Sequence, residues 1–314
     1  MKDYKYIFGP VPSRRLGRSL GVDLVPFKTC SYDCVYCQLG RTTDKTIERK
    51  EYVPVSKVLE ELEQKLSEPD RPDYVTFSGS GEPTLHSGIG EIIAGVKKMT
   101  DVPVAVLTNG SLLWMPEVRR QIIEADLVVP SLDAGDKELF ERVNRPDPAI
   151  SFPKMLDGLF AFRKEYPGKI WIEVFLLKDL SASEEAVRKI AEYVKKIKPD
   201  KIQINTATRP PAELFARPVP EPDLRKLACI LGPGAEIIAD YRGTHQRKEF
   251  VATSSVILDM LRRRPCSLED VAQGLDIHKN EATKHLGELL SKGKITIQQS
   301  GDRVYYKIAS RNDS

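Results

Sequence analysis

Hydrophobic residues along the first two hundred positions follow two alternating patterns. Short runs rich in β-branched residues predict strands, and amphipathic segments with helical periodicity lie between them. The runs are Val22–Val25, Tyr74–Ser78, Val104–Thr108, Leu127–Ser131, Ile170–Leu177 and Lys201–Asn205, and the helical segments are Val55–Leu66, Ile89–Met99, Pro116–Ala125, Phe152–Tyr166 and Glu184–Ile197. Six strand–helix repeats predict a parallel sheet with helices outside. Because an eight-unit barrel needs more chain, we expect an α/β fold: a partial (βα)6 TIM-like barrel, open on one side.

The alternating pattern is interrupted twice after residue 205. The stretch 209–222 contains five prolines, which neither a helix interior nor a central strand accommodates. A second break falls at Arg242–Lys248, after which the pattern changes character. We therefore expect two domains, a barrel domain at 1–248 that includes the proline-rich segment, and a smaller domain at 249–314.

The last sixty residues predict three helices and a hairpin. The helices lie at Val251–Leu261, at Val271–Leu275 behind a capping Ser267, and at Asn280–Leu290, and strands at Ile295–Gln298 and Val304–Ile308 flank a Ser-Gly-Asp turn. This order is typical of a winged helix-turn-helix domain.

The sequence leaves open whether this domain binds nucleic acid or protein. The outer side of its third helix carries polar residues suited to a nucleic-acid groove, namely His278, Lys279, Asn280, Thr283 and Lys284. However, residues 251–314 hold ten Lys or Arg against eight Asp or Glu, a weak basic excess for a nucleic-acid domain. Docking or dimerisation is the alternative.

Composition limits the cellular locations and the functional classes that we expect for the protein. The 314 residues carry a formal net charge of +3, too little to argue for nucleic acid by itself. No apolar run approaches the roughly 20 residues that span a bilayer, so no membrane location is expected. The charged start has no apolar signal core, and the cysteines show no disulfide pattern, which predicts a cytoplasmic protein.

Polar residues follow the end of each predicted strand. After the cysteine-rich segment behind the first strand come Ser78–Pro83, Thr108–Gly110, Ser131–Asp133, Lys178 and Asn205–Thr206. Any one of these could be an ordinary turn. In parallel α/β proteins these ends share one rim, where the chemistry is located, so all of them together indicate an active site.

Three cysteines, Cys30, Cys34 and Cys37, lie within eight residues, and the other two, Cys229 and Cys266, are distant. A structural zinc site needs four protein ligands, and no histidine pair accompanies this motif. An odd number of cysteines disfavours disulfides. A cubane iron–sulfur cluster takes four thiolates, so three would hold one and leave an iron open to a bound molecule.

The Cys-x3-Cys-x2-Cys spacing, with Tyr36 before the last cysteine, is similar to the signature of the radical S-adenosylmethionine superfamily. Gly79-Ser80-Gly81-Glu82-Pro83 resembles the glycine-glycine-glutamate-proline motif of that superfamily, with Ser80 in place of a glycine. The resemblance spans residues 7–245. The segments Gly9–Arg15 and Asn144-Arg145-Pro146 further resemble segments of the subgroup classed with archaeal wyosine-base synthases.

The resemblance implies the cofactors and their ligands. Cys30, Cys34 and Cys37 would hold a [4Fe–4S] cluster whose fourth iron binds S-adenosylmethionine, and reduction would yield a 5′-deoxyadenosyl radical, in an oxidoreductase or a transferase. The electron would come from an external donor of the ferredoxin or flavodoxin type. Expected cofactor contacts are Tyr36, Gly79, Ser80, Gly81, Glu82, Pro83, Asn109, Ser131, Asp133, Lys178 and Asn205, with Glu82 alternatively capping a helix.

The sequence indicates less about the substrate than about the cofactors. Arg142, Asn144 and Arg145 form either a substrate or anion site or a solvated helix end, and Arg14–Arg18 either bind a phosphate at the barrel mouth or form a solvated arm. Residues 1–29 lack the cysteines that hold a second cluster in wyosine-base synthases, which argues against pyruvate condensation on tRNA. An enzyme acting on an RNA base or a small molecule is expected, and a DNA-binding regulator sensing redox state or S-adenosylmethionine is the alternative.

Overall fold

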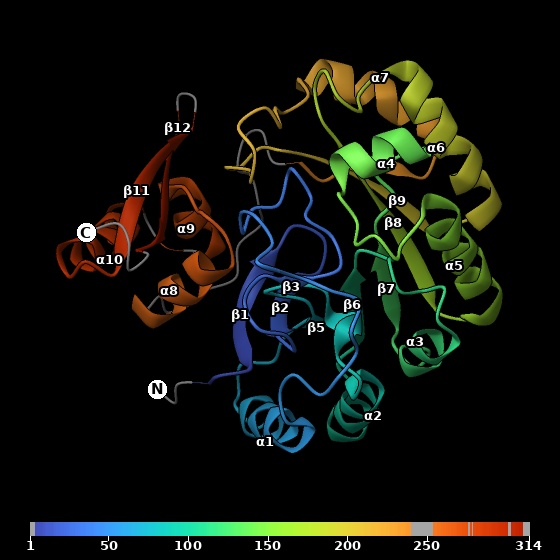
Figure 1. The fold of residues 1–314 in the computed structure, drawn as a ribbon. Helices are drawn as coiled ribbons and strands as arrows, with labels where there is room; N and C mark the ends of the chain where they lie inside the picture. The colour runs from blue at the N-terminus through green and yellow to red at the C-terminus, as the bar shows by residue number, and fades with distance from the viewer. Residues whose placement is uncertain (1–3, 240–253, 276, 278, 301–302, 310–314) are drawn as a thin grey trace.

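An open, mostly parallel sheet forms the centre of the larger part of the molecule (Figure 1). The computed structural model describes residues 4–239, 254–275, 277, 279–300 and 303–309. Within them the sheet has the strand order β1-β2-β5-β6-β7-β8-β9-β10, with β1 antiparallel to β2 and the other neighbours parallel. Its strands are β1 (Ile7–Ser13), β2 (Gly17–Val22), β5 (Tyr74–Phe77), β6 (Val104–Thr108), β7 (Leu127–Pro130), β8 (Lys169–Leu176), β9 (Lys201–Thr206) and β10 (Ala235–Ile237). The strands β1 and β10 are therefore its two edges.

Helices cover the outer face of this sheet (Figure 1). They are α1 (Val55–Leu66), α2 (Ile89–Met99), α3 (Pro116–Gln121), α4 (Lys137–Val143), α5 (Phe152–Glu165), α6 (Glu184–Ile197) and α7 (Glu221–Leu231). The Ser183 side chain caps α6, and the helix buries Val187, Ile190 and Val194 against the sheet. No described helix has the length and apolar character that a membrane crossing requires.

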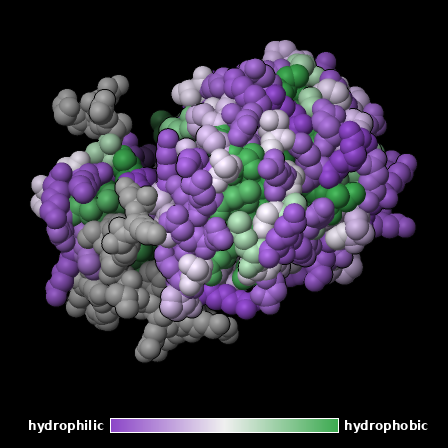
Figure 2. Space-filling model, turned by 90° about the horizontal axis from the view of Figure 1, so that it is seen from below, coloured by the Kyte–Doolittle hydropathy of each residue, from purple (hydrophilic) through white to green (hydrophobic). Residues whose placement is uncertain are grey.

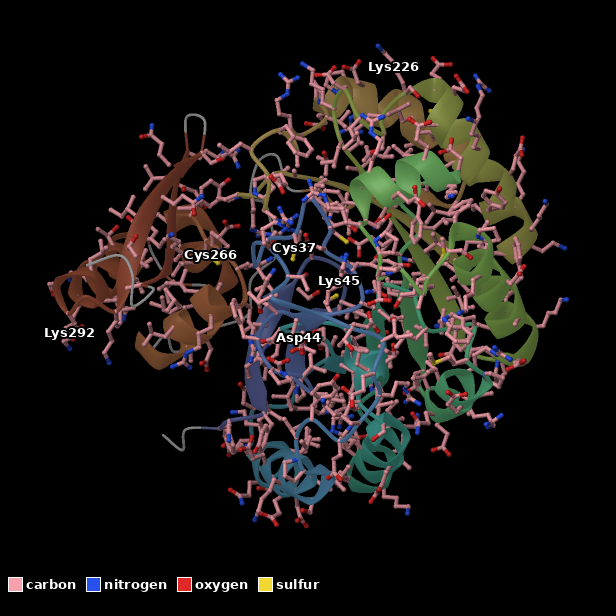
Figure 3. The ribbon with its side chains drawn as sticks, viewed as in Figure 1. Cys37, Asp44, Lys45, Lys226, Cys266 and Lys292 are labelled. Atoms are coloured by element: carbon pink, nitrogen blue, oxygen red, sulfur yellow. The ribbon has the colours of Figure 1, made fainter. Side chains whose placement is uncertain are left out.

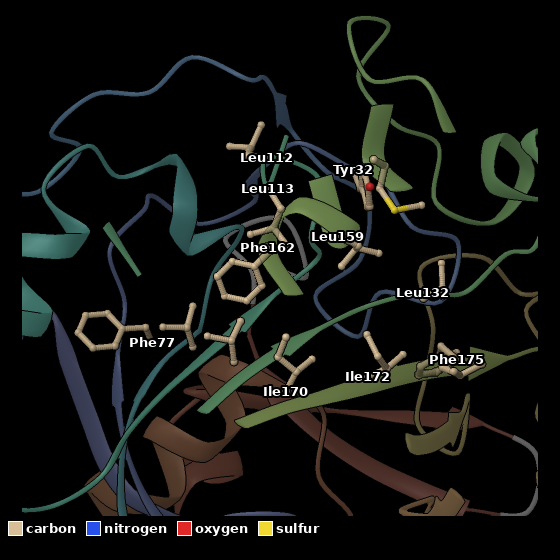
Figure 4. Packing of buried hydrophobic residues seen from close by; sticks show 14 of the residues in the cluster. Tyr32, Phe77, Leu112, Leu113, Leu132, Leu159, Phe162, Ile170, Ile172 and Phe175 are labelled. Carbon is tan, nitrogen blue, oxygen red and sulfur yellow. The ribbon is translucent and has the colours of Figure 1, made fainter. Parts of the chain in front are cut away.

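The core lies between the strands and these helices. Phe77 of β5, Ile172 of β8, and Leu159 and Phe162 of α5 belong to the same apolar cluster (Figure 4). The surface seen from below is mainly hydrophilic, with hydrophobic side chains gathered toward its middle (Figure 2). The α/β prediction with a mostly parallel sheet is therefore confirmed.

Several elements differ from the sequence-based expectation. The first parallel strand is Gly17–Val22, not Val22–Val25, because its small and polar residues hide it from a search for β-branched runs. The edge strands β1 and β10 and the helix α7 were not predicted at all. Pro222 lies in the first turn of α7, where no intrahelical N–H is needed, so the proline-rich segment ends in a helix.

Residues 254–309, called here the C-terminal module, contain α8 (Ser254–Arg263), α9 (Leu268–Gly274), α10 (Lys279–Ser291), β11 (Ile295–Ser300) and β12 (Arg303–Ile308). Their order matches the predicted three helices and hairpin. Residues of all three helices, such as Ile257, Val271 and Leu286, form an apolar cluster apart from the core of the sheet. The start of the first predicted helix, the hairpin turn at 301–302 and the predicted boundary near residue 248 lie outside the described residues.

The C-terminal module lies beside β1, on the open side of the sheet (Figure 1). Arg263 of α8 pairs with Asp23, which follows β2, and its guanidinium lies 3.8 Å from the centre of the Phe8 ring. Near the other edge, the Tyr305 hydroxyl donates to the Thr208 carbonyl at 2.8 Å. The module therefore contacts both sides of the opening.

Candidate functional site

The three clustered cysteines lie on a loop at the carboxyl ends of the parallel strands. Cys30 ends the short strand β3 (Thr29–Cys30), which pairs with β4 (Asp44–Lys45), and Cys34 and Cys37 follow in turns. The backbone N–H of Val35 donates to the Val143 carbonyl at 2.9 Å, which ties the loop to the end of α4. Cys37 is central in the molecule, whereas Cys266 lies in the C-terminal module (Figure 3).

Each of the three sulfur atoms has one side-chain donor. The pairs are Asn109 Nδ2 with Cys30 Sγ at 3.6 Å, Asn144 Nδ2 with Cys34 Sγ at 3.6 Å, and Lys28 Nζ with Cys37 Sγ at 3.8 Å. These donors come from the end of β6, the end of α4 and the cysteine loop itself. Donors aimed at sulfur stabilise thiolates, so the set suits a thiolate-bound cluster.

The contact of Lys28 with Cys37 is the strongest of these observations, because the lysine side chain is buried. The residue is 3% exposed, and its ammonium also donates to the Gly40 carbonyl. Among the described residues no carboxylate forms an ion pair with it. A buried ammonium normally needs an anionic partner. The thiolates of an iron–sulfur cluster would supply that negative charge.

The arrangement of the three cysteines differs from that of a mononuclear metal site. Within the described ranges no three His, Cys, Asp or Glu side chains converge on one ion, whereas the thiolates of a cubane bind different irons. Burial, followed by the Glu82 carboxylate, raises the pKa of Cys30 to about 12, and burial also raises the pKa of Cys34. Cluster assembly must therefore release protons from these thiols.

The glycine-containing loop packs directly on the cysteine loop. Lys28 N–H donates to the Ser80 carbonyl at 2.8 Å, and Glu82 N–H donates to the Thr29 carbonyl at 3.2 Å. A Cβ at Gly81 would lie 1.7 Å from the Thr29 oxygen, and Gly79 has a φ of +137°. The glycines thus permit contact between the two loops, an alternative to the close approach to a cofactor expected from the sequence.

Glu82 caps the short helix η1 (Pro83–Leu85), as the alternative interpretation of the sequence proposed. Its buried carboxylate accepts from the Thr84 backbone N–H at 3.1 Å, the Thr108 hydroxyl at 2.6 Å and the Asn109 N–H at 2.7 Å. Burial raises the pKa of Glu82 despite these donors. The residue joins the glycine loop to the end of β6.

Asp133 organises the opposite side of the cysteine loop. Its carboxylate accepts from the Tyr36 hydroxyl at 2.5 Å, Asn144 Nδ2 at 2.7 Å and Phe175 N–H at 2.9 Å. Burial raises the pKa of Asp133 to about 6, although these donors oppose the shift. The Tyr36 and Phe175 rings stack with their centres 3.9 Å apart.

A cavity of about 400 Å³ lies beside the cysteine loop. Residues that line it include Cys34, Tyr36, Cys37, Ser131, Phe175 and Asn205. Of the expected cofactor contacts, the structure therefore places Tyr36, Ser131 and Asn205 at the cavity. The other expected contacts do not line it, namely Gly79, Ser80, Gly81, Glu82, Pro83, Asn109, Asp133 and Lys178.

The remaining candidates are spread over different surroundings. Lys178 is exposed. Arg142 is also exposed and lies 3.8 Å from Glu138 on its own helix, consistent with a solvated helix end. Arg145 pairs with Glu213 at 2.6 Å. Asn144, by contrast, is buried between the cysteine loop and Asp133.

Several residues at the site were missed from the sequence. Glu173 lines the cavity and accepts from both terminal nitrogens of Arg15 at 2.9 Å. A carboxylate inside the apolar run Ile170–Leu177 was a signal that could have found it. Lys28 and the cavity-lining Arg264 carried no such signal, because their positions depend on contacts between distant segments.

Comparisons with known proteins agree with this geometry. The sequence profile of the radical SAM superfamily matches residues 24–204. A UPF0026 protein of Methanocaldococcus jannaschii is 35% identical over 307 residues, which cover 95% of this chain and 94% of that protein. A protein of Brachyspira hyodysenteriae named GTPase Obg is 38% identical over 297 residues, 93% of this chain but only 43% of that protein. The chain thus spans less than half of the latter's length.

Solved structures share the fold at low sequence identity. TYW1 with a lysine-pyruvate adduct bound has a TM-score of 0.52 at 19% identity, covering 68% of this chain and 72% of that one. A radical SAM methyltransferase from Sphaerobacter thermophilus has a TM-score of 0.53 at 15% identity, covering 71% and 67%. Such similarity establishes the architecture alone.

The profile match covers more than half of the chain, and the UPF0026 relative matches along nearly its whole length. The family uses a [4Fe–4S] cluster and S-adenosylmethionine, which agrees with the donor set around the cysteines. This chain is a member of the radical S-adenosylmethionine superfamily and, within it, of the UPF0026 proteins.

Proposed function

We propose that this chain is a radical enzyme in which Cys30, Cys34 and Cys37 hold the [4Fe–4S] cluster beside the 400 Å³ cavity. When bound and reduced, the cluster supplies the electron that cleaves S-adenosylmethionine to a 5′-deoxyadenosyl radical, which abstracts hydrogen from the substrate. The observation that carries the proposal is the set of three donors, one for each sulfur. A structural cysteine loop has no need of a buried lysine.

The chain's own residues position the cofactors. Tyr36, stacked on Phe175, offers an aromatic surface for the adenine. Ser131 places a hydroxyl group at the cavity for the ribose or the methionyl group, and Asn205 lines the cavity while its amide donates to Glu173 at 3.0 Å and accepts from the Thr206 N–H at 2.9 Å. Glu82 and Asp133 lie behind the residues that contact the cofactors, because protein donors already occupy their carboxylates.

The C-terminal module is proposed to be a winged helix-turn-helix domain that covers the cavity and recruits a partner. Its helix α10 lies on the side away from the sheet (Figure 1). Of the polar residues expected on the outer side of that helix, Thr283 and Lys284 are exposed. His278 and the side chains of Lys279 and Asn280 lie outside the described residues. Nucleic acid and protein remain the two candidate partners.

An external donor of the ferredoxin or flavodoxin type is proposed to deliver the electron. The surface next to the cysteine loop supports docking of such a donor, since Phe27 is 60% exposed there. The exposed Arg41 nearby is already paired with Asp33 and Glu213, each at 2.8 Å, so the apolar group carries this proposal.

The substrate is proposed to be an RNA base or a small molecule. The relatives at 35% identity and above do not single out wyosine-base synthesis, and no comparison supports the alternative of a DNA-binding regulator. The residues and the cavity therefore favour an enzyme over a sensor.

Anaerobic reconstitution tests this function directly. The wild-type chain should bind about four irons and release 5′-deoxyadenosine from S-adenosylmethionine when reduced with dithionite. Cys34→Ser should lose both properties. Cys229→Ser, which changes an exposed cysteine on α7, is the matched control and should retain them. Zinc without iron, or equal 5′-deoxyadenosine release by the Cys34 variant, would contradict the proposal.

A further inference from the structure

Arginines from both ends of the chain line the cavity beside the cysteine loop. They are Arg14, Arg15, Arg209, Arg263 and Arg264, and Glu173 is the carboxylate among the described lining residues. Arg14 and Arg15 follow β1, whereas Arg263 and Arg264 belong to the C-terminal module at the end of α8. The cavity wall is therefore rich in guanidinium groups where the module meets the sheet.

Two of these arginines have carboxylate partners of their own. Glu173 accepts from Arg15 through two hydrogen bonds of 2.9 Å. Asp23 pairs with Arg263, whose Nη1 also donates to the Ser80 hydroxyl at 3.1 Å. These contacts neutralise the two charges and fix the side chains in place.

Of the remaining three, Arg14 donates to the Ile238 carbonyl at 3.4 Å, and Arg209 and Arg264 lie near a single described carboxylate, Asp270. Asp270 of α9 pairs with Arg209 at 2.9 Å, and the Arg209 side chain is only 4% exposed. In the described part of the chain, Arg209 Nε is buried without a hydrogen-bond partner, and Arg264 makes no ion pair. Burial lowers the pKa of Arg264, and the charge of Arg209 adds to this effect. Among the described residues, Asp270 is thus the one carboxylate that acts on both guanidinium groups.

Cys266, two residues after Arg264, is buried in the apolar cluster of the C-terminal module (Figure 3). A guanidinium offers a planar fork of donors that matches phosphate and carboxylate oxygens. An incompletely neutralised pair of such groups at a cavity is the arrangement that an anion completes. Building on the radical function proposed above, we propose that Arg209 and Arg264 form a subsite for an oxyanion group, phosphate or carboxylate, of the substrate.

Binding of simple anions to the full-length chain without its cluster tests the subsite. Isothermal titration at constant ionic strength would use pyrophosphate in one arm and malonate in the other, to separate phosphate from carboxylate as the preferred group. Arg264→Gln should weaken binding of the preferred anion about 10- to 100-fold, the range expected for a charge-assisted hydrogen bond. The control, Arg225→Gln, changes an arginine on α7 that pairs with Glu221 and should bind as wild type.

Thermal unfolding gives a second readout in the same variants. Because no carboxylate of the described residues forms an ion pair with Arg264, Arg264→Gln should keep or raise the Tm without anion and lose the Tm increase that the anion causes in wild type. Arg264→Lys should recover part of the affinity, since it restores charge without the planar fork. A lower Tm for the Gln variant with an unchanged anion effect would overturn the subsite.

The assignment to substrate is tested with S-adenosylhomocysteine. Simultaneous binding of this cofactor analogue and the anion supports a substrate subsite, whereas competition between them would show that the arginines take the cofactor carboxylate and would overturn the assignment. If neither anion binds while reconstituted protein still releases 5′-deoxyadenosine, this inference fails and the proposed function stands. Anion binding without 5′-deoxyadenosine release would refute the proposed function alone.

Discussion

Replacing Lys28 by methionine should lower the reduction potential of the cluster. The ammonium lies 3.8 Å from Cys37 Sγ and is buried, so its charge acts on the cluster with little screening by solvent. Reduction adds a negative charge, which a nearby cation stabilises. Methionine keeps most of the side-chain length and removes the charge, so the reduced state should lose this stabilisation.

The magnitude follows from Coulomb's law. With the added electron spread over the cluster at about 6 Å from the ammonium and an effective dielectric constant of about 20, the interaction is roughly 3 kcal/mol. For a one-electron couple, about 1.4 kcal/mol corresponds to 59 mV. We therefore expect Lys28→Met to lower the potential by about 120 mV.

The potential can be measured by a redox titration monitored by electron paramagnetic resonance, on samples matched for iron content. Lys28→Arg retains the positive charge and should stay close to the wild type. Lys45→Met is the matched control, because Lys45 is exposed on β4 and its charge is screened by solvent. Equal potentials for wild type and Lys28→Met, at equal iron content, would refute the role of this lysine.

Three further predictions concern stability and the C-terminal module. Burial would raise the pKa of Asp270, but Arg209 and other donors lower it to about 2, so the stabilisation should be complete above about pH 4 and disappear as pH falls toward 2. In urea unfolding of the cluster-free chain, Asp270→Asn should therefore be about 2–3 kcal/mol less stable than wild type at pH 7, and a gap that does not shrink at low pH would contradict this. Glu82→Ala should lower the unfolding free energy by at least about 2 kcal/mol, because buried donors lose their acceptor; an unchanged Tm would instead favour a role in cofactor binding alone. A chain truncated after Lys248 should keep its cluster and slowly release 5′-deoxyadenosine without substrate, measured by chromatography, since the three sulfur–donor pairs precede residue 145; loss of the cluster would show that the module is not separable.

Regular helices were the most predictable part of the fold. The predicted bounds of α1, α2 and α6 match the structure at both ends, because each helix buries one apolar face and carries lysine in its last turn. The strand β1 escaped prediction because it contains Pro10 and Pro12 and is stabilised by pairing with β2. Such pairing is a tertiary property that local periodicity does not report.

The candidate site shows the same difference between features that local sequence indicates and features that depend on tertiary contacts. Cysteine spacing alone indicated a cluster, and polar residues at the strand ends indicated the rim on which it lies. The partners that give these residues their roles could not be predicted, since Asn144 and Cys34 are 110 positions apart and Arg263 and Asp23 are 240 positions apart. The sequence therefore indicated the chemistry of the site but not its charge balance.

The contact between Arg263 and Asp23 has a consequence for biosynthesis. Asp23 is among the first residues to leave the ribosome, whereas Arg263 follows 240 residues later. The parallel strands through β9 are complete at residue 206, so at about 5–20 residues per second roughly 3–11 s pass between their synthesis and that of Arg263. During this interval Arg263 and Arg264 do not yet line the cavity, so we expect the cysteines to be more accessible to iron and sulfide on the nascent chain. Maturation of the metal centre and closure of the cavity are thereby separated in time by the order of translation.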